Sequence, residues 1–266
     1  MEPESTMPST LKKLMLAFLI FLFLILFIYM CFLVAGTKKK IASINEEYGF
    51  EMSAGSPVDE KLHNNPEYLE LQKKKSFLEA RIKMAESDSI CLSVNLEDSL
   101  ALLEINGAVV FSSKISRIRL NSIFNKASEY AIAGMLSSPL EVDESFSTIK
   151  KEPIMIKIAP KDTIEANVPD IMPDTSSFEA VNFILVMKNG VRLYVYQEEE
   201  DKSSDKRSMF KFDLNDRMRF TRSAIDSIVK LKAPESEPFI KIRLPKDDAK
   251  IIYRAIARKG LVSIYR

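Results

Sequence analysis

The sequence predicts a mainly β domain with a few helices, of the α+β class, preceded by one transmembrane helix. Residues 14–35 contain no charged residue and are dominated by Leu, Phe and Ile. Two Asn-Gly pairs, at Asn106 and Asn189, each separate apolar runs, which is the strongest short signal for a β-hairpin. Segments with helical spacing lie between these strand signals, so we expect a mixed, β-rich sheet structure.

Residues 14–35 are long enough to cross a bilayer. At about 1.5 Å per residue they span about 33 Å, against a hydrocarbon core of about 30 Å. A cleaved signal peptide has an apolar core of only about 7–15 residues, so an uncleaved anchor is favoured. Lys12 and Lys13 precede the run and residues 38–40 follow it, so the charge balance does not decide the orientation. We expect residues 1–13 to form a short cytoplasmic tail.

The two segments that follow the apolar run differ in composition and in the spacing of their apolar residues. Residues 36–65 are polar and carry Gly, Ser, Pro and Asn, which predicts a spacer. Asn65 as N-cap and Pro66 at the first position predict an amphipathic helix over residues 66–87. Its apolar residues at helical spacing are Leu71, Leu78, Ile82 and Ala85. This face either packs on the chain's own domain or forms a short dimerising coiled coil.

Residues 88–266 form the predicted domain. Its strands are expected in a first hairpin, in a second hairpin and near the C-terminus: Ile90–Val94, Leu100–Ile105, Ala108–Phe111, Phe183–Met187, Val191–Tyr196, Ile240–Leu244 and Leu261–Tyr265.

Helices and loops are predicted around these strands. We expect helix within residues 119–135, around Leu214, Met218, Ile225 and Ile228, and from Asp247 onward. Residues 139–177 hold five prolines and are predicted as loop with one strand at Ile154–Ile158. Residues 198–208 are predicted as a solvated charged loop.

The composition argues against several functions. The net charge is +1, so no basic excess indicates a nucleic-acid partner. Cys31 lies in the anchor and Cys91 in an apolar run, which does not suggest a disulfide framework. The one histidine, His63, precedes the domain, and no Cys/His cluster has metal-ligand spacing. The residue inventory therefore predicts no cofactor and no enzyme.

The C-terminal segment carries a family resemblance. The run Ile242-Arg243-Leu244-Pro245, an acidic helix start at Asp247 and the closing strand after Gly260 resemble the end of the L,D-transpeptidase catalytic domain. The first hairpin and the strands around Asn189 are similar to earlier parts of that domain, in the same order. The resemblance implies an L,D-transpeptidase-like β-sandwich over residues 88–266.

The departures from the family determine the expected activity. In the family a Ser/Thr-His-Gly-Cys run precedes the Ile-Arg-Leu-Pro segment, and its cysteine attacks a peptidoglycan stem peptide. Here Lys241 stands in place of the nucleophile and Phe239 in place of its histidine base. The family's other histidine falls near Tyr194, which is a poor base at neutral pH. The resemblance therefore implies an inactive member of the family.

These observations predict a membrane-anchored pseudoenzyme that binds peptidoglycan or envelope proteins as a scaffold. It would sit in the inner (cell) membrane through residues 14–35 as a single-pass protein, with an extracytoplasmic C-terminal domain. The ligand-binding candidates are Arg243, Lys241 and Tyr194, because a guanidinium is suited to pair with a peptide carboxylate. The alternatives are a structural membrane protein that forms a homodimer through residues 65–86, and a cell-wall enzyme with catalytic residues unlike the family's.

Overall fold

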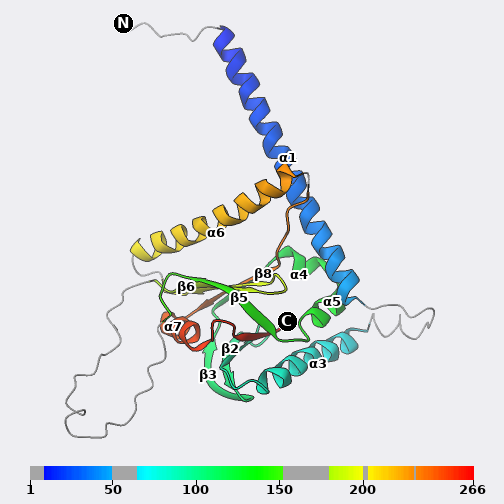
Figure 1. The fold of residues 1–266 in the computed structure, drawn as a ribbon, viewed down its shortest axis with the longest axis vertical. Helices are drawn as coiled ribbons and strands as arrows, with labels where there is room; N and C mark the ends of the chain where they lie inside the picture. Colours follow the sequence, from blue (N-terminus) through cyan, green and yellow to red (C-terminus); the bar gives the residue numbers. More distant parts are fainter. Residues whose placement is uncertain (1–8, 50–64, 152–179, 200–202, 231) are drawn as a thin grey trace, which may run out of the picture.

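The computed structural model describes residues 9–49, 65–151, 180–199, 203–230 and 232–266. They form an α+β domain with a long N-terminal helix that projects from it (Figure 1). The strand predicted at Ile154–Ile158 and the histidine His63 lie outside the described residues.

The N-terminal helix α1 runs from Ser9 to Tyr48. It is long and apolar enough to cross a membrane, and its most apolar stretch is not buried by the rest of the chain. The prediction of a spacer from residue 36 was wrong for residues 36–48, which continue the helix. Ile44 is only 2% exposed and belongs to the main hydrophobic core, because this end of α1 packs on two helices of the domain.

The described strands form one hydrogen-bonded sheet of nine strands in the order β3-β2-β1-β9-β5-β6-β7-β8-β4. Two neighbouring pairs, β1 with β9 and β7 with β8, are parallel, and the other pairs are antiparallel. In chain order the strands are β1 (Cys91–Asn95), β2 (Leu100–Ile105), β3 (Ala108–Lys114), β4 (Arg117–Leu120), β5 (Leu140–Ser147), β6 (Asn182–Met187), β7 (Arg192–Gln197), β8 (Phe239–Leu244) and β9 (Leu261–Tyr265).

Helices account for 51% of the described residues and strands for 25%, so the α+β class is confirmed and the helices are more extensive than predicted. The difference comes from the length of α1 and from α6, which begins inside the segment predicted as a charged loop. The helices after α1 are α3 (Pro66–Ala85), α4 (Ser122–Lys126), α5 (Glu129–Met135), α6 (Ser203–Val229) and α7 (Lys246–Ala255).

Both predicted hairpins are present. Asn106 and Gly107 have φ angles of 49° and 79°, so the β2–β3 turn requires two left-handed residues, which Asn-Gly tolerates well. The β6–β7 turn has Gly190 at a φ of 82°. Strand β5 was missed because its segment was assigned to a proline-rich loop. It joins the two halves of the sheet by pairing with both β9 and β6.

Helix α3 begins as predicted but buries a different face. The Asn65 side chain accepts a 3.0 Å hydrogen bond from the Glu67 backbone N–H, which is the expected N-cap. The buried residues are Ser76, Ala80 and Met84, whereas the predicted apolar stripe of Leu71, Leu78 and Ile82 is exposed. The small side chains of Ser76 and Ala80 face the contacts that α3 makes with α5 and β9.

The sheet half from β6 to β8 has two different faces. One face contributes Phe183, Leu193 and Ile242 to the main core, which also includes residues of α4, α5 and α7. The other face carries Ile184, Tyr194 and Tyr196, against which Met209 and Phe212 of α6 pack. Alternation of side chains along each strand separates the two faces. Helix α6 therefore covers the face that is opposite the main core.

Candidate binding pocket beneath helix α6

Two rows of side chains cross the covered face of the sheet. Arg119 of β4 pairs with Lys241 of β8, which pairs with Tyr194 of β7. One step along, Arg117 pairs with Arg243, which pairs with Tyr196. Residues that are paired in register and separated by two positions lie on the same face of a sheet. The tertiary structure therefore places all three candidate residues from the sequence on one face.

Helix α6 closes over this face through hydrogen bonds. The Tyr196 hydroxyl donates a 2.6 Å hydrogen bond to Asp213 Oδ1, and the Tyr194 hydroxyl donates a 2.7 Å bond to Asp216 Oδ2. Arg192 also donates to Asp216, at 3.2 Å. These hydrogen bonds attach the polar side of α6 to β7.

A cavity of about 220 Å³ remains between α6 and the β4–β8 edge. Five of its lining side chains are cationic and one is a carboxylate, so its charge is strongly positive. A guanidinium fork can hold a carboxylate with two parallel hydrogen bonds, which makes an anionic group the best-suited ligand. The lining residues are Arg117, Arg119, Tyr196, Met209, Asp213, Arg217, Lys241, Ile242 and Arg243.

Lys241 lies at the base of this pocket within an aromatic cluster. Its Nζ donates a 3.3 Å hydrogen bond to the Tyr196 hydroxyl and lies 4.6 Å from the centroid of the Tyr194 ring. Burial lowers the pKa of Lys241, and the Asp213 carboxylate acts against this effect. The chain Lys241–Tyr196–Asp213 fixes the ammonium group in one position and leaves it partly accessible at the cavity wall.

Tyr194 does not line the pocket. It is 7% exposed, and its hydroxyl is committed to Asp216 under α6. Burial raises the pKa of Tyr194, and the hydrogen bond to Asp216 raises it further. The phenol is therefore neutral at ordinary pH, and its ring contacts the Lys241 ammonium group. Lys241 and Arg243, in contrast, line the cavity.

Four charged residues of the pocket were not predicted. Arg117 and Arg119 have a detectable signal, since the run Arg-Ile-Arg-Leu repeats the alternation of Lys-Ile-Arg-Leu in β8 and places both cations on one face. Asp213 and Arg217 were missed because α6 was interpreted from its apolar positions alone.

Cys91 of β1 lies outside the lining of this pocket. It is buried, and burial raises the pKa of its thiol. A protonated thiol is a weak nucleophile.

Neither a family model nor a curated protein matches the sequence. The likeness to L,D-transpeptidases therefore depends on the residues quoted above and remains a prediction.

Proposed function

We propose that this chain is a membrane-anchored, catalytically inactive relative of the L,D-transpeptidases that binds peptidoglycan or an envelope protein as a scaffold. Its α1 helix would hold it in the inner membrane as a single-pass protein, with the domain on the extracytoplasmic side. The proposal includes the L,D-transpeptidase-like fold for residues 88–266.

The cationic pocket carries this proposal. Lys241, the residue that replaces the family's nucleophile, and Arg243, which matches its arginine, both line the pocket together with Arg117, Arg119 and Arg217. Peptidoglycan stem peptides present carboxylates, which are the groups that such a pocket favours. Recognition without turnover is the function that follows, since an ammonium and a neutral phenol stand in place of the thiolate and imidazole.

Co-sedimentation of the full chain, in detergent, with intact peptidoglycan sacculi tests this proposal. We expect binding by the unaltered protein, and weaker binding by Arg243→Ala and by Arg119→Ala, which each remove one cation from the pocket. Lys75→Ala is the matched control, because it removes an equally positive charge from the exposed surface of α3. Equal loss in all three variants would indicate nonspecific attraction to charge. Absence of binding would direct attention to protein partners instead.

A second candidate function has its own observation. The face of α3 that carries Leu71, Leu78 and Ile82 is exposed, and these positions are separated by seven and four residues, as in a heptad seam. A second copy could pack against this stripe, so that the protein acts as a structural dimer. Sedimentation of the full chain at several concentrations tests this candidate. Association that is abolished by Leu78→Asp would favour the dimer, whereas unchanged association would exclude this face.

A further inference from the structure

Helix α6 exposes its apolar side. Leu214, Met218 and Ile225 are separated by four and seven residues, so they lie on one side of the helix. Phe210 and Val229 extend this side by four residues in each direction. None of them is covered by the domain, and Phe210 is 68% exposed. The exposed apolar stripe of α6 consists of Phe210, Leu214, Met218, Ile225 and Val229.

The opposite side of α6 is attached to the domain both by polar groups and by the apolar side chains of Met209 and Phe212. Asp216 is buried and receives hydrogen bonds from Tyr194 and Arg192. The Arg219 guanidinium carbon lies 3.6 Å from the centroid of the Phe146 ring. A helix on a water-soluble surface normally keeps its apolar side chains on the buried side, whereas α6 carries a second, exposed apolar side. An apolar environment on the outer side of α6 would remove the exposed stripe from water.

The position of α6 relative to α1 indicates what those surroundings are. The C-terminal end of α6 meets α1 where the apolar span gives way to the domain (Figure 1). The segment after α6 contacts α1 at residues 36 and 37. The Pro234 carbonyl lies so close to Gly36 that no side chain would fit at this position. The Ser236 and Thr37 hydroxyls are 3.3 Å apart. If residues 14–35 span the bilayer, α6 lies at its surface.

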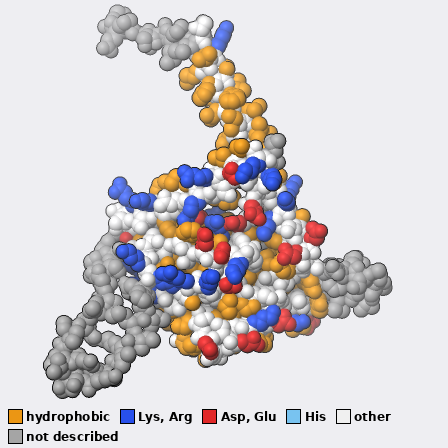
Figure 2. All heavy atoms as spheres, viewed as in Figure 1, with side chains coloured by type: hydrophobic (Ala, Val, Ile, Leu, Met, Phe, Trp, Pro, Cys, Tyr) orange, Lys and Arg blue, Asp and Glu red, His pale blue; other side chains and the backbone are white. Residues whose placement is uncertain are grey.

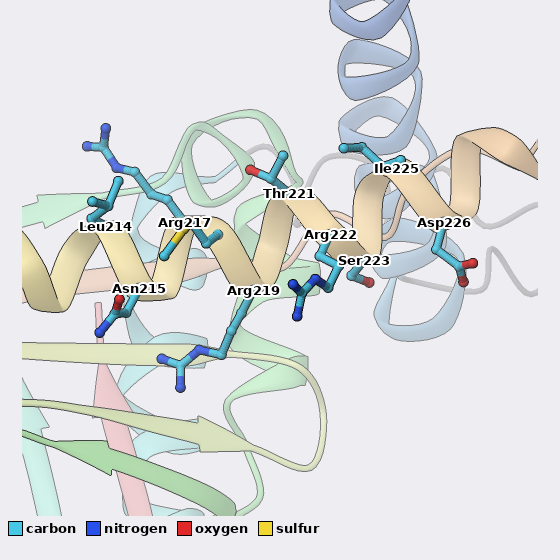
Figure 3. Close-up of a pocket in the computed structure, with 10 residues that line it drawn as sticks. Leu214, Asn215, Arg217, Arg219, Thr221, Arg222, Ser223, Ile225 and Asp226 are labelled. Atoms are coloured by element: carbon cyan, nitrogen blue, oxygen red, sulfur yellow. The ribbon is translucent and has the colours of Figure 1, made fainter.

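The exposed apolar stripe of α6 faces the side of the molecule on which the apolar part of α1 lies. In the close-up, Leu214, Thr221 and Ile225 lie on the edge of α6 turned away from the sheet, the side toward which α1 continues (Figure 3). Asn215 and Arg219 point toward the sheet. The exposed stripe is therefore turned toward the same side as the membrane-spanning part of α1.

The charges of α6 are distributed to match an anionic surface. Lys211, Arg217 and Arg222 are exposed and flank the stripe. The carboxylates Asp213 and Asp216 are engaged with the sheet, and the exposed Asp226 is paired with Lys230. Some Lys and Arg side chains lie on the edge of the domain next to the apolar part of α1, and others, with carboxylates among them, lie further down the same face (Figure 2). Basic residues that border an apolar stripe are typical of helices lying in a membrane interface.

We propose that α6 is an interfacial helix, whose exposed apolar stripe enters the headgroup region of the membrane that α1 spans, on anionic lipid. This proposal depends on the anchor in the proposed function but not on any peptidoglycan ligand. A second copy of the chain is a poorer occupant, because a symmetric contact through this side would bring the cations of both copies together. Lipid contact at α6 would place the cationic pocket beside the membrane surface.

Tryptophan fluorescence tests the inference well, because the sequence contains no Trp. The full chain is reconstituted into vesicles containing anionic lipid, with single variants Leu214→Trp in the stripe, Leu22→Trp in α1 and Val110→Trp on β3. All three positions are exposed, so the larger side chain can be accommodated. Lipids brominated near the top of the acyl chains quench a Trp that lies about 5–10 Å into the headgroup boundary. Lipids brominated near the chain ends are used for Leu22→Trp, because Leu22 lies near the middle of the predicted span.

We expect a blue-shifted emission and loss of intensity with brominated lipid for L214W, and neither effect for V110W. The effect on L214W should weaken when anionic lipid is replaced by zwitterionic lipid, or when Lys211→Glu and Arg222→Glu are added. A blue shift without quenching would indicate a protein partner and overturn the inference. Quenching of L22W but not of L214W would overturn it while leaving the anchor intact. If L22W is not quenched either, the anchor and the inference fail together.

Discussion

The Tyr194 hydroxyl donates a 2.7 Å hydrogen bond to the Asp216 carboxylate, and this bond joins the sheet to α6. Both side chains are buried, and Asp216 also receives hydrogen bonds from Arg192 at 3.2 Å and Arg219 at 3.3 Å. One carboxylate therefore accepts hydrogen bonds from two guanidinium groups and one phenol, and Glu237 forms a second ion pair with Arg192. The contact holds α6 over the sheet face that carries Lys241 and Arg243.

Replacing Asp216 by alanine should destabilise the domain. The change leaves the buried Tyr194 hydroxyl without its acceptor, while Arg192 keeps its ion pair with Glu237, and an unsatisfied buried donor costs about 1–3 kcal/mol of the free energy of unfolding. Tyr194→Phe should cost less, because Asp216 keeps its two arginine partners. Urea denaturation of the full chain in detergent measures both. Asp226→Ala is the control, since its exposed ion pair with Lys230 is worth at most about 1 kcal/mol. Equal effects of D216A and D226A would contradict the role given to Asp216.

Stability should fall at alkaline pH. Burial and hydrogen bonds to Asp216 and Asp213 raise the pKa of Tyr194 and Tyr196 above the ordinary value of about 10. Below pH 10 the tyrosines are neutral in both states and their contribution is fully present. Above about pH 10 the unfolded chain loses these protons and the folded chain keeps them, so the free energy of unfolding decreases as pH rises.

Denaturation between pH 8 and pH 11 measures this effect. The double variant Tyr194→Phe/Tyr196→Phe should show a shallower decrease than the unaltered chain. Phe210→Leu changes an exposed side chain of α6 that carries no ionisable proton, so it should leave the slope unchanged. Identical slopes in all three proteins would show that other groups control the alkaline transition.

The inner end of α1 should behave as part of the domain. Ile44→Ala removes a side chain that is almost wholly buried, and such changes cost about 2–5 kcal/mol. Ser43→Ala, on the exposed side of the same turn, should be close to neutral. Limited proteolysis of the full chain reports the difference as faster cleavage of the domain in I44A. Equal cleavage rates would show that residues 36–48 do not stabilise it.

The proposed orientation predicts labelling from outside the membrane. Asn189→Cys places a thiol in the β6–β7 turn, and we expect a membrane-impermeant maleimide to label it in intact spheroplasts. Ser5→Cys in the predicted cytoplasmic tail should be labelled only after lysis. Cys91 is buried and should contribute little background. The reverse pattern would place the domain in the cytoplasm and contradict its proposed access to peptidoglycan.

The sequence by itself determined the features that depend on neighbouring residues. The Asn106-Gly107 turn is specified locally, because two adjacent positive φ angles are tolerated by few residue pairs. The cap at Asn65 depends on a side chain that reaches the N–H two residues away. The apolar run of residues 14–35 likewise produces a membrane-length helix without help from the domain.

The tertiary structure decided which side of each helix is buried. Periodicity identified apolar stripes on α3 and α6 but not the surroundings that each stripe meets. Leu78 on α3 is 53% exposed, because small residues on the other side of the helix face the domain. Asp216 on α6 is buried because Tyr194 and Arg192 satisfy its carboxylate. The pocket required the same long-range information, since the pairing of β4 with β8 brings Arg119 beside Lys241 across more than a hundred residues of chain.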